Sequence, residues 1–172
     1  IIPEGVQTDL FGNIVESKTP ATAEIQEEIT EVVQASRHIH NTPHQYLAIR
    51  GDEEIKKFVD DLLKQPEICF DTETTGIDAN NCELVGMSFS YKKGEAYYVP
   101  LPPDDQEETK RRLQLFAPLF GNPSVVWIGQ NLKYDMLVLK WYDHELRGNI
   151  FDTMLAHYVI DPDGKRSMDM LS

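Results

Sequence analysis

The sequence has few of the features that place a chain in a membrane or outside the cell. No run approaches the roughly 20 consecutive apolar residues that a spanning helix needs, and the first residues include neither a basic leader region nor an initiator Met. The two cysteines, Cys69 and Cys82, form neither a CxxC motif nor a disulfide framework. We therefore expect a piece of a longer cytoplasmic polypeptide, with unpaired thiols and no membrane partner.

Basic residues are also scarce. The 172 residues contain 16 Lys and Arg against 29 Asp and Glu, which gives a formal net charge of −13. Proteins that coat nucleic acid usually carry a basic footprint, so this charge argues against such a partner. A protein that grips only a strand end through bound divalent cations can nevertheless be acidic, because the metals supply the positive charge.

Two regions of different character divide the chain. Residues 1–45 combine several Pro and Gly with Thr, Glu and Gln, which is typical of a linker, and residues 23–35 have the apolar spacing of one short helix. Residues 46–172 alternate apolar strand and helix patterns and form the predicted domain.

The pattern of this domain predicts an α/β fold. Strands are expected over 46–50, 67–72, 84–91, 96–101 and 124–128, and helices over 52–65, 106–120, 132–142 and 153–160, with Asp52 as the cap of the first helix. The second to fourth strands should form a meander. Consecutive strands followed by strands alternating with helices indicate a mixed β-sheet flanked by α-helices, compatible with a ribonuclease H-like architecture.

The sharpest local feature is the segment Phe-Asp-Thr-Glu-Thr-Thr-Gly at 70–76, directly after an apolar strand. Because side chains alternate along a strand, Asp71 and Glu73 should point to the same face, about 6 to 7 Å apart at the backbone. Gly76 then turns the chain away and leaves the end of the strand open to a ligand.

A second feature, Gly-Gln-Asn-Leu-Lys-Tyr-Asp at 129–135, links an apolar strand to a helix. Asn131 suits the helix N-cap, and Asp135 rises from the same face one turn later. Asp135 should therefore face Asp71 and Glu73 across the sheet edge.

The electrostatic repulsion among three clustered carboxylates has to be offset by protons or cations. Like charges 4 Å apart at an effective dielectric near 20 cost about 4 kcal/mol, so such groups share protons or bind cations. Ligation by oxygen alone favours Mg²⁺ or Mn²⁺ over zinc. Two such ions can generate a hydroxide nucleophile and neutralise a leaving 3′ oxygen in phosphodiester hydrolysis.

These two segments resemble the first two exonuclease motifs of the four-acid nuclease superfamily. The form Gln-Asn-Leu-Lys-Tyr-Asp, with Phe-Asp-Thr-Met-Leu at 151–155, is most similar to the 3′-to-5′ proofreading exonuclease domains of the bacterial DNA polymerase I family. The resemblance covers 46–172, and 1–45 is similar to the connector that follows the 5′ nuclease domain in that family.

The resemblance implies roles for individual residues. Asp71 and Glu73 would hold a catalytic metal ion, and Asp71 and Asp135 a second. The partners would be a single-stranded DNA 3′ end and the polymerase and 5′ nuclease domains of the parent chain. Contacts to the strand would come from Thr74, Ile77, Gln130, Asn131, Tyr134 and Lys165 or Arg166.

One departure from the family concerns its third motif, a Tyr followed four residues later by an Asp. Asp169 is no substitute, because position 165 is Lys. We therefore expect a domain truncated before its third motif, with little turnover on its own. Two other functions stay open: a non-catalytic scaffold domain of a polymerase, and an exoribonuclease similar to RNase D.

Several residues have simpler interpretations. Asp152 is expected to cap a helix rather than bind metal, and the run 110–112, Lys-Arg-Arg, to be a solvated helix face. Trp127, Trp141, Tyr97 and Tyr98 are expected to be core or half-buried residues rather than base-stacking platforms.

Overall fold

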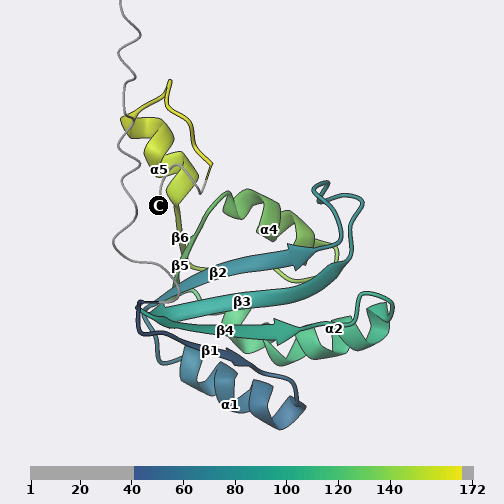
Figure 1. The fold of residues 1–172 in the computed structure, drawn as a ribbon. Helices are drawn as coiled ribbons and strands as arrows, with labels where there is room; N and C mark the ends of the chain where they lie inside the picture. The colour runs from purple at the N-terminus through teal and green to yellow at the C-terminus, as the bar shows by residue number, and fades with distance from the viewer. Residues whose placement is uncertain (1–40, 168–172) are drawn as a thin grey trace, which may run out of the picture. The chain divides into compact units, whose positions relative to one another are not determined.

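The computed structural model describes residues 41–167, and within this range the chain forms one six-stranded sheet and five helices (Figure 1). The predicted linker lies outside the described residues except for 41–45, as does Asp169. The strands are β1 (Gln45–Ala48), β2 (Glu67–Thr74), β3 (Leu84–Lys92), β4 (Glu95–Pro100), β5 (Val126–Gly129) and β6 (Asn149–Asp152). The helices are α1 (Asp52–Leu62), α2 (Gln106–Leu115), α3 (Ala117–Phe120), α4 (Leu132–Lys140) and α5 (Thr153–Ile160).

The sheet is mixed, as the sequence predicts. Its strand order is β1-β4-β3-β2-β5-β6. Strands β2, β3 and β4 form the expected antiparallel meander, whereas β1 pairs with β4, β5 with β2 and β6 with β5 in parallel. The long β2 strand therefore lies inside the sheet, with an antiparallel and a parallel neighbour.

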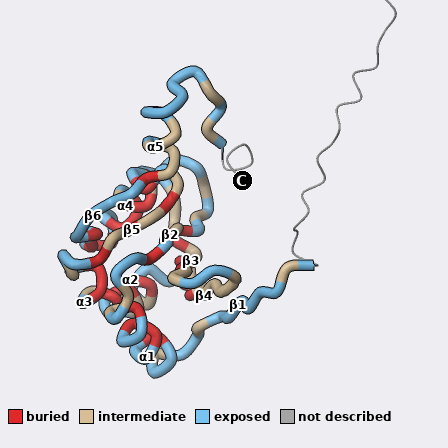
Figure 2. The backbone as a smooth tube through the Cα atoms, turned by 90° about the vertical axis from the view of Figure 1, so that its left-hand side faces the viewer, coloured by how far each residue is buried: buried red, intermediate tan, exposed pale blue. Residues whose placement is uncertain are grey.

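One face of the sheet carries the hydrophobic core. Phe70 of β2 pairs in register with Phe89 of β3, and both are buried. Phe116 stacks on Phe89 with ring centroids 5.5 Å apart, while Phe58 of α1 meets the same ring edge-on at 5.6 Å. Buried positions cluster between the sheet and these helices, as Figure 2 shows in red. The opposite face of β2 is left to polar residues.

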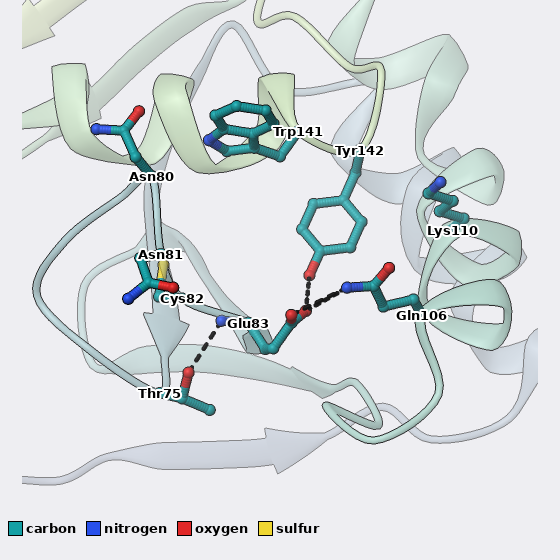
Figure 3. Close-up of a pocket in the computed structure, with 9 residues that line it drawn as sticks. All are labelled: Thr75, Asn80, Asn81, Cys82, Glu83, Gln106, Lys110, Trp141 and Tyr142. Atoms are coloured by element: carbon teal, nitrogen blue, oxygen red, sulfur yellow. Dashed lines mark hydrogen bonds between the residues drawn. The ribbon is translucent and has the colours of Figure 1, made fainter.

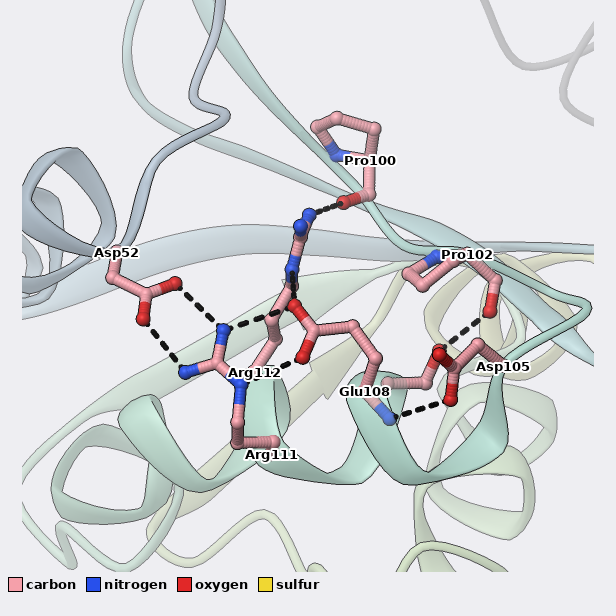
Figure 4. Close-up of polar contacts among 8 residues, drawn as sticks. Asp52, Pro100, Pro102, Asp105, Glu108, Arg111 and Arg112 are labelled. Carbon is pink, nitrogen blue, oxygen red and sulfur yellow. Dashed lines mark hydrogen bonds and ion pairs between the residues drawn. The ribbon is translucent and has the colours of Figure 1, made fainter.

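Helix α1 begins at Asp52, the residue that was expected to be its cap. Gly51 occupies the N-cap position without a side-chain bond, and Asp52 is the first helical residue, so the expected capping role of Asp52 is wrong. The Asp52 carboxylate instead accepts two hydrogen bonds from Arg111 of α2, at 2.6 and 2.9 Å. This pair joins the first turn of α1 to α2 (Figure 4).

The basic run at 110–112 is neutralised largely by acids of its own surface. Arg111 and Arg112 both bind Glu108, at 2.6 and 2.7 Å, and Arg112 also donates to the Pro100 carbonyl oxygen (Figure 4). The two guanidinium groups lower the pKa of Glu108 to about 2. These arginines are therefore used in ion pairs and hydrogen bonds at the protein surface and do not form a free cationic patch.

The structure differs from the sequence pattern at two further elements. The helix expected over 106–120 is split into α2 and α3 around Phe116, because Pro118 has no N–H and disfavours a regular helix before it. Strand β6 was not expected at all. Its four residues pair with β5 along its whole length but are too short to give a periodic pattern.

The end of β6 is tied to two helices by one carboxylate. Asp152 caps α5, accepting from the N–H groups of Met154 (2.9 Å) and Leu155 (3.2 Å). It also accepts from the N–H groups of Asn131 (3.1 Å) and Leu132 (2.8 Å) at the start of α4. The expected capping role of Asp152 is thus confirmed, and the same side chain caps a second helix.

Replacing Asp152 should therefore cost more than the loss of an ordinary cap. We expect Asp152→Ala to lower the free energy of unfolding by about 2 to 4 kcal/mol, because two helix N-termini lose their acceptors. Chemical denaturation monitored by circular dichroism measures this. Asp60→Ala, at an exposed acid of α1, is the matched control and should change stability by less than about 0.5 kcal/mol. Equal effects of the two changes would contradict the double-cap assignment.

Candidate functional site

Two carboxylates lie on the open face of β2. Asp71 is half-buried and Glu73 is exposed, whereas Thr72 between them is buried on the core side. Asp71 pairs in register with Ser88 and Glu73 with Gly86, and the pairing shifts between Glu73 and Thr74. The expected alternation is confirmed, and the shift in register leaves Val85 of β3 as an extra residue beside the second acid.

The two acids on this face repel each other. Burial raises the pKa of Asp71, and the negative charge of Glu73 raises it further. Each proton or cation bound here relieves part of this cost.

The third acid reaches β2 from α4. Asp135 is 2% exposed, and its Oδ1 accepts from the N–H of Thr72 at 2.8 Å and from the Thr72 hydroxyl at 2.6 Å. Burial is the main cause that raises the pKa of Asp135 to about 6. The bonds from Thr72 act in the opposite direction, and the charge of Asp71 adds to the rise. Asp71 is thus coupled to Glu73 on one side and to Asp135 on the other.

The geometry of a metal site is less complete than the sequence predicts. Among residues 41–167, no group of three or more His, Cys, Asp and Glu side chains forms a ready metal-binding cluster. Asp71, Glu73 and Asp135 nevertheless offer only hard oxygen donors, the class that Mg²⁺ and Mn²⁺ prefer. Burial raises the pKa values of Asp71 and Asp135, and the charge of a neighbouring acid adds to each rise, so a bound cation would stabilise the ionised carboxylates. Ligation by these three residues stays a prediction.

A hydroxyl network fixes the turn that follows the carboxylates. The Tyr134 hydroxyl donates to the Gly76 carbonyl oxygen at 2.6 Å and lies 2.7 Å from Thr74 Oγ1. The Thr74 hydroxyl also donates to the Gly76 oxygen, at 2.8 Å. Ile77, next in the chain, is 98% exposed. Two residues predicted to contact DNA, Thr74 and Tyr134, therefore hold the turn that presents a third.

The remaining residues predicted to contact a strand lie at the start of α4 and after α5. Gln130 donates to the Arg166 carbonyl oxygen at 2.7 Å and accepts from the Thr153 hydroxyl. Asn131 is exposed in the left-handed conformation, with φ 58°, and its side chain makes no cap bond, so the expected side-chain cap is wrong. Asp152 supplies that cap instead.

The two basic residues predicted to contact DNA differ in how far their side chains are held by the protein. The Arg166 guanidinium donates to the Pro162 carbonyl oxygen and lies 4.6 Å from the centre of the Tyr158 ring. Lys165 is exposed. Arg166 is thus held against α5, whereas Lys165 extends into solvent.

One side chain, Tyr98, was not expected from the sequence to lie beside the carboxylates. Gly86 of β3 is the register partner of Glu73. A Cβ at Gly86 would lie 2.2 Å from the Tyr98 hydroxyl, so the Tyr98 side chain lies directly over Gly86, next to Glu73. Burial and the charge of Glu73 raise the pKa of Tyr98. Tyr98 is half-buried, as expected, but it lies on the carboxylate face. A glycine inside a strand pattern was the available signal, because it marks a close approach.

None of the described helices is long and apolar enough to cross a membrane. The fold matches solved structures of nucleases. These include the catalytic core of RRP6 from Trypanosoma brucei (TM-score 0.58, 20% identity, 76% of this chain and 34% of that one) and Brucella melitensis NrnC with bound Mg²⁺ (TM-score 0.56, 16% identity, 74% and 58%). The chain therefore has the ribonuclease H-like α/β fold of such exonucleases.

The sequence comparison defines the family more closely. Residues 46–172 match the 3′-5′ exonuclease domain of family A DNA polymerases, and the chain belongs to this family. It is 42% identical over 113 residues to DNA polymerase I of Pseudomonas aeruginosa and 35% identical over 130 residues to DNA polymerase I of Borreliella burgdorferi. These matches cover 61% and 74% of this chain but 12% and 14% of the relatives. The relatives favour a polymerase-type exonuclease over an RNase D-like one.

The raised pKa of Asp135 predicts a pH-dependent stability. The folded protein holds this proton more tightly than the unfolded chain, so ionised Asp135 reduces stability as the pH rises from about 4 through 6. Asp135→Asn keeps an oxygen acceptor for Thr72 and cannot ionise. The difference in unfolding free energy, mutant minus wild type, should grow by on the order of 1 to 3 kcal/mol between pH 4 and pH 8 without divalent cations.

Thermal or urea unfolding at several pH values measures this difference. The control is Asp60→Asn, at an exposed acid, which should show no such trend. A flat difference for Asp135→Asn across the range would mean that burial does not perturb this carboxyl.

Proposed function

We propose that this exonuclease domain hydrolyses the terminal phosphodiester bond at single-stranded DNA 3′ ends, with two divalent ions, Mg²⁺ or Mn²⁺, and proofreads for a polymerase on the same chain. The observation that carries the proposal is the Asp71–Glu73 pair on the open face of β2, coupled to the buried Asp135. Membership of the 3′-5′ exonuclease family supports it.

The chain's own residues divide the work. Asp71, Glu73 and Asp135 would hold the ions, and Thr72 fixes Asp135 through two hydrogen bonds. Bound divalent ions supply an activated water and offset the charge on the leaving 3′ oxygen. Tyr134 and Thr74 hold the turn that presents Ile77, an apolar side chain suited to contact with the terminal base. Gln130, Asn131 and Lys165 line the path of the strand, and Arg166 shapes the segment beside Gln130.

Two further parts of the assembly are also proposals. None of the seven tyrosines in the sequence has an Asp four residues later, so we propose that the family's Tyr and fourth acid come from a further segment. The 5′ nuclease and polymerase domains would be partners in the same polypeptide. A cytoplasmic setting is consistent with the free thiols of Cys69 and Cys82.

Two other functions share the same acids. An RNase D-like exoribonuclease has some support from the fold of Trypanosoma brucei RNase D, solved in complex with RNA U12 (TM-score 0.57, 13% identity). A non-catalytic scaffold would have no use for the uncompensated charge of Asp71 and Asp135. The relatives' identity as DNA polymerase I favours DNA.

The metal part of the proposal predicts a change in thermal stability. Mn²⁺ should raise the unfolding midpoint of the wild type, because an ion bound only by the folded state stabilises it by mass action. Asp71→Asn should raise the midpoint without metal, since it relieves the repulsion by Glu73, and should abolish the Mn²⁺ effect. Thermal scans with Mn²⁺ and with EDTA measure both.

The matched control replaces an acid on another surface. Glu107→Gln in the first turn of α2 should keep the full Mn²⁺ response. If Asp71→Asn responds to Mn²⁺ like the wild type, Asp71 is not a ligand.

Catalysis is tested in a polypeptide that contains this domain together with a Tyr-x-x-x-Asp segment. We expect stepwise release of nucleotides from the 3′ end of single-stranded DNA, inhibited by EDTA. Asp71→Asn should lower the rate on the order of a hundred- to a thousand-fold or more. A substrate with a blocked 3′ end should be resistant. Faster cleavage of the matching RNA strand would favour the RNase D-like function, and no cleavage of either strand would favour the scaffold.

A further inference from the structure

A polar pocket of about 360 Å³ is lined by Thr75, at the start of the turn that carries Ile77. Its walls come from three parts of the chain: the loop before β3, the helix α2, and the two residues that follow α4 (Figure 3). Asn81 and Cys82 lie on the loop, Lys110 lies on α2, and Trp141 and Tyr142 follow α4. None of these residues has a place in the proposed hydrolysis.

The floor of the pocket is fixed by a closed set of hydrogen bonds. Glu83 accepts from the Gln106 amide with both oxygens, at 2.9 and 3.0 Å, and from the Tyr142 hydroxyl at 3.1 Å (Figure 3). The Thr75 N–H donates to the Glu83 carbonyl oxygen at 3.0 Å, and the Glu83 N–H donates back to the Thr75 hydroxyl at 2.9 Å. The two ends of the loop are thus tied together, and the pocket is preformed.

The rim, in contrast, has unused binding capacity. Trp141 is 62% exposed, so its expected core or half-buried position is wrong, whereas Trp127 is fully buried. The side chains of Trp141, Asn81 and Lys110 make no hydrogen bond or ion pair among the described residues. An exposed indole ring loses water contacts at little cost when a second flat ring covers it.

The chemistry of these groups selects a ligand. Lys110 and Glu83 give the pocket no net charge, and the Glu83 carboxylate on the floor disfavours a phosphate. The Asn81 amide offers both a donor and an acceptor, which match the edge of a heterocyclic base. A flat aromatic surface beside such groups binds unpaired bases by stacking with little preference for sequence.

We propose that this pocket is an accessory subsite that takes an unpaired nucleobase of the single strand, stacked on Trp141, a few nucleotides from the 3′ end. This inference rests on the proposed function. The pocket adjoins the turn of the candidate active site, because Cys82 lies 3.6 Å from the Tyr134 hydroxyl and Thr75 follows Thr74 in the chain.

The two tryptophans allow a direct test, because only the exposed one should respond to a stacked base. Oligothymidylates, from a dinucleotide to an octanucleotide, are added to the intact chain in EDTA, so that no strand is cut. We expect the longer strands to quench the tryptophan emission and the dinucleotide to quench it much less. The buried Trp127 should be unaffected.

Binding strength is measured separately by the anisotropy of a labelled octanucleotide. Trp141→Ala should weaken binding roughly ten-fold, which is within the range for loss of one base–aromatic stack. Trp141→Phe keeps a ring and should bind more tightly than Trp141→Ala. Tyr46→Ala, which removes another exposed aromatic side chain, on β1, should bind like the wild type.

The outcomes separate the subsite from the function on which it rests. Strand binding without quenching, or with equal affinity in Trp141→Ala, overturns the subsite and leaves the exonuclease proposal intact. Quenching by the mononucleotide dTMP at the same concentration overturns the assignment to an extended strand. Absence of any strand binding in EDTA overturns the subsite, whereas the exonuclease proposal is tested separately with metal.

Discussion

The candidate site depends on a difference in length between two neighbouring strands. β5 pairs with β2 only as far as Cys69 and Ile128, while β2 continues to Thr74. Beyond that point the Thr72 N–H has no strand partner on this side, and Asp135 of α4 accepts its hydrogen bond instead. A buried backbone donor without an acceptor would cost about 1 to 3 kcal/mol. The need to satisfy one N–H therefore brings a carboxylate beside Asp71.

The turn between β5 and α4 allows Asp135 to take the place of a strand partner for the Thr72 N–H. A Cβ at Gly129 would lie 2.8 Å from the Phe70 carbonyl oxygen and 2.6 Å from the Leu132 side chain. Only glycine lets the chain leave β5 this close to β2 and begin a helix at once. Asp152 then holds the first N–H groups of that helix. The position of Asp135 thus follows from a glycine, a cap on the next strand and the unpaired end of β2.

The sequence predicted the parts of this arrangement that depend on local periodicity. Alternation along β2 placed Asp71 and Glu73 on one face, and the helical spacing of α4 placed Asp135 within reach. The parts that were missed depend on contacts distant in sequence: the pairing of β6 with β5, and the use of Asp152 rather than Asn131 to cap α4. Exposure of Trp141 was missed for a related reason. Helical spacing shows which residues share a face, but only the packing of α4 shows where the apolar face ends.

The acidic side chains on the two sides of the Ile77 turn differ in the partners that they have. On the side of β2, burial raises the pKa values of Asp71 and Asp135 and the charge of a neighbouring acid adds to each rise, which leaves negative charge for cations to offset. On the side of α2, three acids have partners: Glu108 and Asp52 bind arginine, and Glu83 is held by neutral donors. A strand's phosphates would thus be attracted only where cations bind, while its bases could contact the neutral pocket. A net charge of −13 is therefore compatible with the proposed nucleic-acid binding, in which recognition would be divided between bound metal at the terminus and stacking beyond it.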